Sequence, residues 1–445
     1  MSASPARAAV FDILLRVELQ DAYASELMHS GRLDSLSQAD RGLTTEIVMG
    51  VLRWRSRLDS VIAANSSRPL NRLDTEVLLA LRIAAYQILF LTRIPARAAI
   101  NESVELVKRA RKASAAAFVN AVLRKLSDRG FAVEQQPTGS EQSPGQLADE
   151  FAHPQWLVAR WIHNFGSRTA EAICAHGQRV PSTAIRVEDE AVPRELEADG
   201  IQLAPGALLT SARLVTGGEI TQTRALREGR AFIQDEASQL VALLVGRGSR
   251  ILDSCAAPGS KTAAIAARNP DAVIVAAELH PHRADLLRQR VRAANVHVVT
   301  TDATNLEMSS DFDRVLADVP CSGTGTLARN PEIKWRLKAA DLPDLHVRQV
   351  AILQSALGQL APGGRAVYST CSLEPEENQS VVDEVLAASL DYRLLDCRLE
   401  LERLQAGGEL ALDDVGSLLN GAYLRTFPGI HPSDGFFAAI IERKS

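Results

Sequence analysis

Apolar residues recur at helical spacing through the first 133 residues of the chain. In one segment Val10, Ile13, Leu14 and Val17 are separated by three, one and three positions, which places them on one face of a helix. A surface helix that carries such an apolar stripe must bury it against other helices. The pattern therefore predicts an all-α domain over residues 1–133.

The next stretch has no aliphatic or aromatic residue. Residues 134–145 are rich in Pro, Gly, Ser and Gln, a composition typical of a linker. Helical spacing then returns over Trp156–Phe165 and Ala170–His176, and the stretch Thr183–Val187 favours a strand. We interpret residues 146–235 as a small α+β module.

From residue 236 to the C-terminus, short apolar runs alternate with helical segments. Alternation of this kind is typical of βαβ units in a parallel, doubly wound sheet. We therefore expect residues 236–445 to form a Rossmann-like α/β domain. The expected strands are Arg250–Ser254, Val273–Ala277, Val296–Thr300, Arg314–Ala317 and Arg365–Tyr368, with a final strand over Phe436–Ile441.

Three cysteines follow three of these strands within a few positions. Cys321 and Cys371 each follow an expected strand, and Cys255 opens a turn that contains a Pro-Gly pair. In an open α/β sheet, ligands collect outside the carboxyl ends of the strands. The placement of the cysteines predicts one site at this edge of the sheet.

Carboxylates follow the strands in the same way. Glu278 lies at about the distance downstream of the first turn at which an acidic residue holds a ribose diol, which indicates a ribose-bearing cofactor. Asp302 and Asp318 follow two further strands. The turn itself matches neither the dinucleotide fingerprint nor a phosphate-binding loop, so a dinucleotide-dependent oxidoreductase is less favoured.

Composition narrows the class of protein. The chain has 445 residues, 46% of them hydrophobic, a net charge of −5 and no run of about 18 apolar residues that could span a bilayer. The N-terminus lacks the apolar core of a secretory signal, so we expect a cytoplasmic protein. The five cysteines are widely spaced and include no CxxC pair, which signals neither a disulfide framework nor a metal site.

The motifs together resemble a known family. Cys255–Thr262, Asp318–Gly323 and Thr370–Ser372 resemble the signature motifs of RNA (cytosine-5) methyltransferases that use S-adenosylmethionine. The N-terminal part adds further similarity, so the chain resembles the RsmB/Sun/Fmu family of 16S rRNA methyltransferases, which carry a NusB-like domain. The N-terminal similarity lies in Asp40–Gly42, Gly50–Arg55, Ala85–Gln87 and Phe118–Arg124.

The resemblance implies roles for individual residues. Cys371 would be the nucleophile and Cys321 its helper, although from the residues alone either cysteine could attack. Asp318 would contact the base as well as the cofactor. The implied S-adenosylmethionine contacts are Cys255, Ala256, Ala257, Pro258, Gly259, Ser260, Lys261, Glu278, Asp302 and Asp318. Ser260, Glu278 and Val319 depart from the glycine, aspartate and alanine that are common in the family.

These observations predict methylation of carbon 5 of a cytosine in 16S rRNA through a covalent cysteine adduct. The alternative is an RNA-binding protein or assembly factor with little catalytic activity. We expect an rRNA partner, RNA binding by both the NusB-like domain and the small module, no membrane, no metal and a monomer. Three basic clusters are candidates for RNA contact, namely Arg53, Arg55 and Arg57; Lys108, Arg109, Arg111 and Lys112; and Arg329, Lys334 and Arg336 around Trp335.

Overall fold

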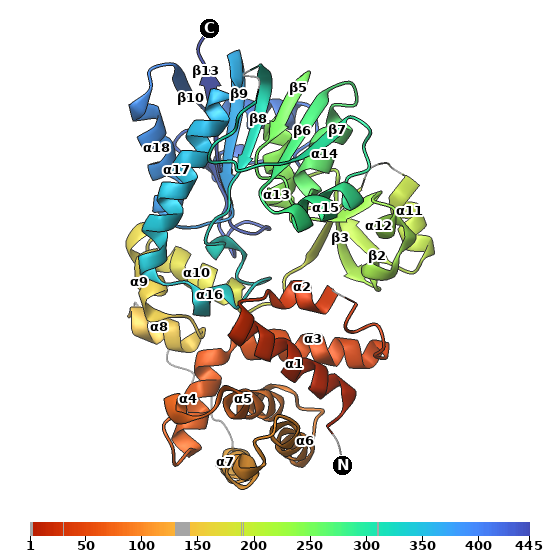
Figure 1. Ribbon diagram of the computed structural model, residues 1–445, viewed down its shortest axis with the longest axis vertical. Helices are drawn as coiled ribbons and strands as arrows, with labels where there is room; N and C mark the ends of the chain where they lie inside the picture. Colours follow the sequence, from red (N-terminus) through yellow and green to blue (C-terminus); the bar gives the residue numbers. More distant parts are fainter. Residues whose placement is uncertain (1–2, 30, 130–142, 188, 190, 309–310) are drawn as a thin grey trace. The chain divides into compact units, whose positions relative to one another are not determined.

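The computed structural model describes residues 3–29, 31–129, 143–187, 189, 191–308 and 311–445, and they form two compact units (Figure 1). Unit 1 comprises Met1–Val180 together with Leu327–Arg336. Unit 2 comprises Pro181–Thr326 and Leu337–Ser445. A short piece of the C-terminal half thus belongs to the N-terminal unit.

The N-terminal part of unit 1 is all-α, as the apolar spacing predicts. Val10, Ile13, Leu14 and Val17 are all buried in one core. The helices are α1 (Pro5–Gln20), α2 (Ala24–His29), α3 (Gln38–Arg53), α4 (Arg55–Asn65), α5 (Thr75–Phe90), α6 (Ala96–Arg109) and α7 (Ala116–Arg129).

Three more helices of unit 1 follow along the chain, namely α8 (Pro144–Glu150), α9 (Gln155–Phe165) and α10 (Ser167–Gly177). Most of the predicted linker lies outside the described residues, but Pro144 and Gly145 are helical. Ser143 starts this helix early, because its hydroxyl accepts from the Gln146 backbone in a capping box. The boundaries at residues 133, 145 and 235 remain predictions.

Unit 2 begins with the sheet of the predicted small α+β module, whereas α9 and α10, the helices at the start of that module, belong to unit 1. This antiparallel sheet has the order β2-β3-β1-β4, and Ile185, Val192 and Leu196 lie in its core. The predicted strand Thr183–Val187 is β1. The other elements are α11 (Ala191–Ala198), β2 (Gln202–Pro205), β3 (Ala212–Gly217), α12 (Arg224–Arg227) and β4 (Ala231–Ile233).

The large sheet of unit 2 contains the predicted strands. Five of them run parallel in the order β9-β8-β5-β6-β7, which confirms the Rossmann-like arrangement. They are β5 (Arg250–Asp253), β6 (Val273–Glu278), β7 (Val296–Thr300), β8 (Phe312–Asp318) and β9 (Leu360–Thr370).

The sheet is not parallel throughout, however. The final strand β13 (Phe437–Arg443) pairs antiparallel with β9 and with β10 (Tyr392–Leu395) and β12 (Tyr423–Arg425), and the two-residue β11 (Leu419–Asn420) extends this edge. The sequence analysis expected a final strand here without assigning its direction, and the structure makes this edge of the sheet antiparallel.

Helices cover both faces of the large sheet (Figure 1). Ile251 and Leu252 are neighbours on β5 and are buried in different cores, because successive side chains of a strand point to opposite faces. One core includes residues of α13 (Glu236–Leu244), α14 (Ser260–Arg268) and α19 (Cys397–Ala406). The other core includes residues of α17 (Leu342–Gly358) and α18 (Gln379–Ala388). A further helix, α15 (Pro281–Arg290), follows β6 in the chain.

Within the described part of the chain, no helix combines the length and apolar character needed to cross a membrane. Among the same residues, no group of three or more His, Cys, Asp or Glu side chains could hold a metal ion.

Candidate active site

The turn after β5 is shaped by one glycine. Gly259 has φ +107°, a conformation that side chains with a Cβ rarely adopt. A Cβ there would lie 2.6 Å from Leu287 Cδ1 and 2.7 Å from Val291 Cγ2, so the turn contacts the end of α15 closely. Burial raises the pKa of the Cys255 thiol to about 12, so this thiol keeps its proton near neutral pH.

Glu278 closes the neighbouring strand β6. Its side chain is 5% exposed, and Oε1 accepts a hydrogen bond of 2.9 Å from the His280 backbone. Arg283 Nη1 lies 3.7 Å from the other carboxylate oxygen, and Arg283 Nη2 donates to the carbonyl of Ala257 at 3.1 Å. Arg283, which the sequence analysis did not single out, therefore links Glu278 to the turn after β5.

Asp302 lies just beyond β7. It is exposed, and its Oδ1 accepts from both the backbone and the hydroxyl of Thr304, at 2.9 and 2.8 Å. These hydrogen bonds hold the pKa of Asp302 below its ordinary value. Asp302 is thus a carboxylate held in a fixed position after β7, at another strand end of the predicted site.

Asp318 and Lys261 form an ion pair at the end of β8. Lys261 Nζ lies 2.7 Å from Asp318 Oδ2, and Ser369 Oγ donates to Asp318 Oδ1 at 2.7 Å. Burial lowers the pKa of Lys261, but the attraction of Asp318 and of Cys371 outweighs it, so the pKa lies above the ordinary value. Lys261 therefore stays an ammonium group that is paired with the carboxylate of Asp318 and interacts electrostatically with Cys371.

The two cysteines meet at the ends of β8 and β9. Their sulfur atoms are 3.3 Å apart, and both residues are partly exposed. The hydrogen bond to Cys371 and burial raise the pKa of Cys321 well above its ordinary value. The Cys321 thiol therefore keeps its proton near neutral pH, and either sulfur can be the donor in the hydrogen bond between the two residues.

Glu377 connects the two cysteine turns, and sequence reasoning missed it. The side chain is fully buried, and Oε1 accepts from the Ser322 backbone at 2.7 Å and from Gln349 Nε2 at 2.9 Å. The hydroxyls of Ser322 and Ser372 both donate to Oε2. Each serine directly follows one cysteine, so Glu377 holds both turns. Its neighbours Glu374 and Glu376 offer no local signal that distinguishes it.

Asp253 is a second residue that sequence reasoning left out of the site. It is 1% exposed, and Thr262 Oγ1 donates to Oδ2 at 2.7 Å. Oδ1 is buried and has no hydrogen-bond partner among the described residues. Burial raises the pKa of Asp253 to about 7. A carboxyl group before the turn, at the end of an apolar strand, was the signal available in the sequence.

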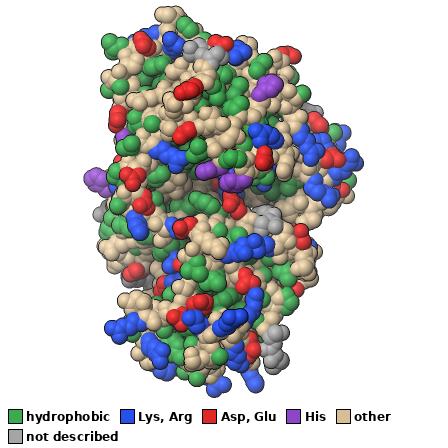
Figure 2. All heavy atoms as spheres, in the orientation of Figure 1, with side chains coloured by type: hydrophobic (Ala, Val, Ile, Leu, Met, Phe, Trp, Pro, Cys, Tyr) green, Lys and Arg blue, Asp and Glu red, His purple; other side chains and the backbone are tan. Residues whose placement is uncertain are grey.

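The basic clusters are mostly engaged within the protein. Lys108 pairs with Glu105, Arg109 with Asp12 and Lys112 with Asp74. Lys334 is 1% exposed and donates to a backbone carbonyl, so the prediction that it contacts RNA is wrong. Arg53, which is 5% exposed, also donates to a backbone carbonyl. Figure 2 shows the same mixing of charges over the small module, where Arg224 pairs with Glu228 and Arg230 with Glu195.

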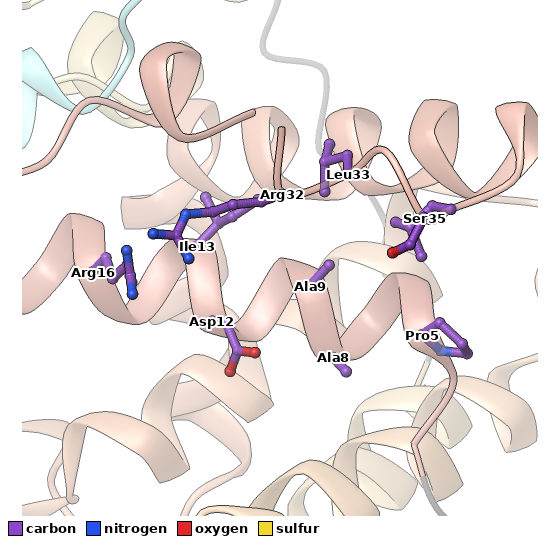
Figure 3. Close-up of a pocket in the computed structure, with 10 residues that line it drawn as sticks. Pro5, Ala8, Ala9, Asp12, Ile13, Arg16, Arg32, Leu33 and Ser35 are labelled. Atoms are coloured by element: carbon purple, nitrogen blue, oxygen red, sulfur yellow. The ribbon is translucent and has the colours of Figure 1, made fainter. Parts of the chain in front are cut away.

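A cavity of about 400 Å³ lies elsewhere, in unit 1 (Figure 3). It is lined by residues of α1 and of the stretch before α3, among them Arg16 and Arg32. None of the predicted site residues lines it. Asp12 at its edge is paired with Arg109 at 2.7 Å.

Family models match three parts of the chain. Residues 241–442 match the family described as 16S rRNA methyltransferase RsmB/F, residues 4–128 match the NusB family, and residues 153–218 match the ferredoxin-like domain of RsmF/B-like methyltransferases. The chain is 32% identical to the probable ribosomal RNA small subunit methyltransferase B of Bacillus subtilis, over 100% of both chains. The chain belongs to the RsmB/F family of 16S rRNA methyltransferases.

Two further similarities cover most of the chain. The ribosomal RNA small subunit methyltransferase B of Pseudomonas putida is 34% identical over 86% of this chain and 90% of its own. The crystal structure of PH0851 has the same fold, with a TM-score of 0.80 at 24% identity over 100% of both chains. As a member of the RsmB/F family, the protein is a methyltransferase that uses S-adenosylmethionine.

The strand ends fit this cofactor. Glu278 offers a buried carboxylate for the ribose diol, and Oδ1 of Asp253, which has no hydrogen-bond partner in the described part of the chain, offers a further acceptor beside the turn. Asp302 and Asp318 present carboxylates at the next strand ends. The small side chains of Ala256, Ala257, Pro258, Gly259 and Ser260 allow close approach to the turn backbone.

Proposed function

We propose that this RsmB/F family member methylates carbon 5 of a cytosine in 16S rRNA, and that Cys371 forms the covalent adduct. The observation that carries the proposal is the pair of sulfur atoms 3.3 Å apart at the ends of β8 and β9, beside the Lys261–Asp318 ion pair. A single nucleophile needs no second thiol. Two thiols at one strand edge suit a reaction in which one attacks and the other assists.

Carbon 5 of cytosine is a weak nucleophile, and covalent catalysis activates it. The Cys371 thiolate forms a bond to carbon 6, and the electron pair of the C5–C6 double bond moves to carbon 5. Asp318 holds a proton on ring N3 of the cytosine by accepting a hydrogen bond from it, and this protonated ring is more electrophilic at carbon 6. Lys261 stabilises negative charge on the neighbouring carboxylate and thiolate. S-adenosylmethionine supplies the methyl group as an electrophile.

Release reverses the covalent step. Carbon 5 takes the methyl group, with the electron pair of the broken bond left on the cofactor sulfur. A base then removes the C5 proton, the C6–S bond breaks and the C5–C6 double bond forms again, which returns Cys371 as a thiolate. Cys321 keeps its proton beside Cys371, and we assign it to this release step. The target base must leave its stack to reach these groups.

The substrate assignment rests on the relatives. Two of them are named as ribosomal RNA small subunit methyltransferases, and they align with most or all of this chain. We infer that the substrate is 16S rRNA, that a monomer acts on it in the cytoplasm, and that the NusB-like region contributes to RNA binding. A non-catalytic RNA-binding or assembly protein is the alternative, and it has no use for the paired thiols.

Two measurements test the proposal. Bisulfite sequencing of 16S rRNA from a deletion strain should reveal one cytosine that has lost its methyl group. The purified protein, given 16S rRNA and labelled S-adenosylmethionine, should restore 5-methylcytosine at that position, as shown by mass spectrometry of nucleosides. Unchanged rRNA methylation in the deletion strain, together with no transfer by the purified protein, would support the assembly-factor alternative.

A further inference from the structure

Residues 327–336 belong to unit 1, although their chain neighbours on both sides belong to unit 2. We name this stretch the capping segment. It begins six positions after Cys321, and it ends in the short helix α16 (Ile333–Arg336). Its polar side chains are used at the ends of helices of the NusB-like region.

The end of α3 is one of these places. The last carbonyls of a helix have no partner within the helix. Trp335 Nε1 donates to the Leu52 carbonyl at 2.6 Å, and Lys334 Nζ donates to the Arg53 carbonyl at 2.9 Å. In return Arg53 Nη2 donates to the Ala328 carbonyl at 3.0 Å. The segment and the end of α3 therefore satisfy each other's hydrogen bonds.

The neighbouring ends of α1 and α2 are bound in the same way. Arg336 donates to the carbonyls of Val17, Asp21 and Ala22, at 2.8, 2.8 and 2.5 Å. Glu332 is 1% exposed and accepts from the first backbone N–H of α2, that of Ala24, at 2.8 Å. An acid at a helix N-terminus and a base at a C-terminus match the helix dipoles. Three helix ends thus hold ten residues of the C-terminal half.

The residues between Cys321 and the capping segment are held as well. The backbone N–H of Gly325 donates to the Cys371 carbonyl at 2.9 Å, and Thr324 Oγ1 accepts from the Leu373 backbone at 2.8 Å. Only Thr326 separates these contacts from the capping segment. The stretch that carries Cys321 is therefore bound to the Cys371 turn within unit 2, and the capping segment that follows it in the chain is bound to helix ends within unit 1.

We propose that unit 1 positions the loop that carries Cys321, and that Trp335 and Arg336 act as positioning residues for release of the covalent adduct. The inference rests on the proposed function for its catalytic consequence, but its structural consequence is independent. It gives the NusB-like region a role in the reaction besides RNA binding. Small displacements suffice for this, because a misplacement of about 1 Å can cost about a hundredfold in rate.

The test uses the full-length protein and two variants, Arg336→Met and the double variant Trp335→Phe with Arg336→Met. Methionine keeps the aliphatic stem at position 336, and phenylalanine keeps an aromatic ring at position 335. Both changes remove donors to helix carbonyls. Arg336→Lys keeps one donor group, so its turnover and the alkylation rate of its Cys321 should lie between those of the wild type and those of Arg336→Met. Arg213→Met is the matched control, because Arg213 also donates to backbone carbonyls, those of Thr210 and Ala212 in the small module.

The proposal predicts an imbalance between attack and release. Each variant should lose about tenfold or more of its turnover, since release needs the thiol of Cys321 in place. The adduct that survives denaturing gel electrophoresis should accumulate, as it would in Cys321→Ser. The affinity for S-adenosylmethionine should change by less than about twofold, because no residue of the cofactor site is altered. Circular dichroism checks that the variants are folded.

A second readout does not depend on the reaction. Iodoacetamide should alkylate Cys321 faster in the variants, measured by mass spectrometry relative to Cys255 in the same molecule. If a folded variant retains wild-type turnover and wild-type alkylation of Cys321, the proposal is wrong. It is also wrong if adduct and product fall together in proportion to the loss of folded protein. If the wild-type protein methylates no cytosine, the proposed function fails, and the alkylation rates alone decide this inference.

Discussion

Cys321 and Cys371 are identical residues in different surroundings. The hydrogen bond to Cys371 and burial raise the pKa of Cys321. Cys371, in contrast, interacts electrostatically with the ammonium group of Lys261. We expect Cys371→Ser to abolish turnover and adduct formation, because a hydroxyl is a far poorer nucleophile near neutral pH. Cys321→Ser should instead trap an RNA–protein adduct on denaturing gels. The opposite pattern would exchange the roles, and turnover retained by both variants would exclude a covalent mechanism.

Asp253 makes stability depend on pH. Burial raises its pKa from 3.8 to about 7, so between these values the folded protein holds a proton that the unfolded chain has released. The free energy of unfolding therefore falls as the pH rises through this window, and the loss from this group is complete above it. In Asp253→Asn this contribution is absent, while Thr262 can still donate to the amide oxygen.

Urea unfolding at several pH values measures this contribution. Near pH 4 the variant and the wild type should have similar stability, and at about pH 8 the variant should be more stable by an amount that reflects the raised pKa. Thr262→Val is a useful companion, because it removes the hydroxyl that donates to Asp253. Parallel stability curves for Asp253→Asn and wild type would show that Asp253 does not titrate in this window.

At the scale of elements, two turns depend on one carboxylate. Glu377 accepts from Ser322, Ser372 and Gln349, so Glu377→Ala would leave buried donors without partners, each at a cost of about 1–3 kcal/mol. We expect a lower melting temperature and a loss of turnover of more than about a hundredfold. Glu377→Gln keeps one acceptor oxygen and should be milder. Calorimetry should find the affinity for S-adenosylmethionine nearly unchanged, because Glu377 lies outside the cofactor strand ends.

The turn between β5 and α14 depends on a missing side chain. In Gly259→Ala the new Cβ would meet Leu287 and Val291 at less than 3 Å, in addition to the strain of φ +107°. We expect weaker binding of S-adenosylmethionine in calorimetry, by about tenfold, because the turn must shift away from α15. Gly408→Ala is the control, since Gly408 has φ +72° and no atom within 4 Å of the added Cβ. Equal effects of the two changes on cofactor affinity would contradict the steric argument.

At the scale of the whole molecule, the two units should divide the work. A protein that starts at Pro181 keeps every predicted cofactor residue, so its affinity for S-adenosylmethionine should stay within a few fold of wild type. It loses the NusB-like region and leaves the capping segment without its helix ends. We expect weaker RNA binding in a gel-shift assay and a still larger loss of methyl transfer. If the shortened protein methylates 16S rRNA as well as the full chain, unit 1 has neither role.

Much of the architecture follows from local patterns. The spacing of Val10, Ile13, Leu14 and Val17 predicted buried helical faces, and the apolar runs predicted five parallel strands. Polar residues directly after strands predicted where the site lies, because all parallel strands end at one edge of their sheet. These conclusions need only the periodicity of each element and the direction of the strands.

Tertiary structure decided the roles of individual polar residues. Lys334 and Arg336 look like RNA contacts in the sequence, yet they bind the ends of helices that lie roughly 280 to 320 positions earlier in the chain. The 3.3 Å between two sulfur atoms, the burial of Glu377 and the raised pKa of Asp253 likewise depend on partners far away in the sequence. Burial and electrostatic interaction act through space, so a charged residue reveals its task only when its neighbours are known.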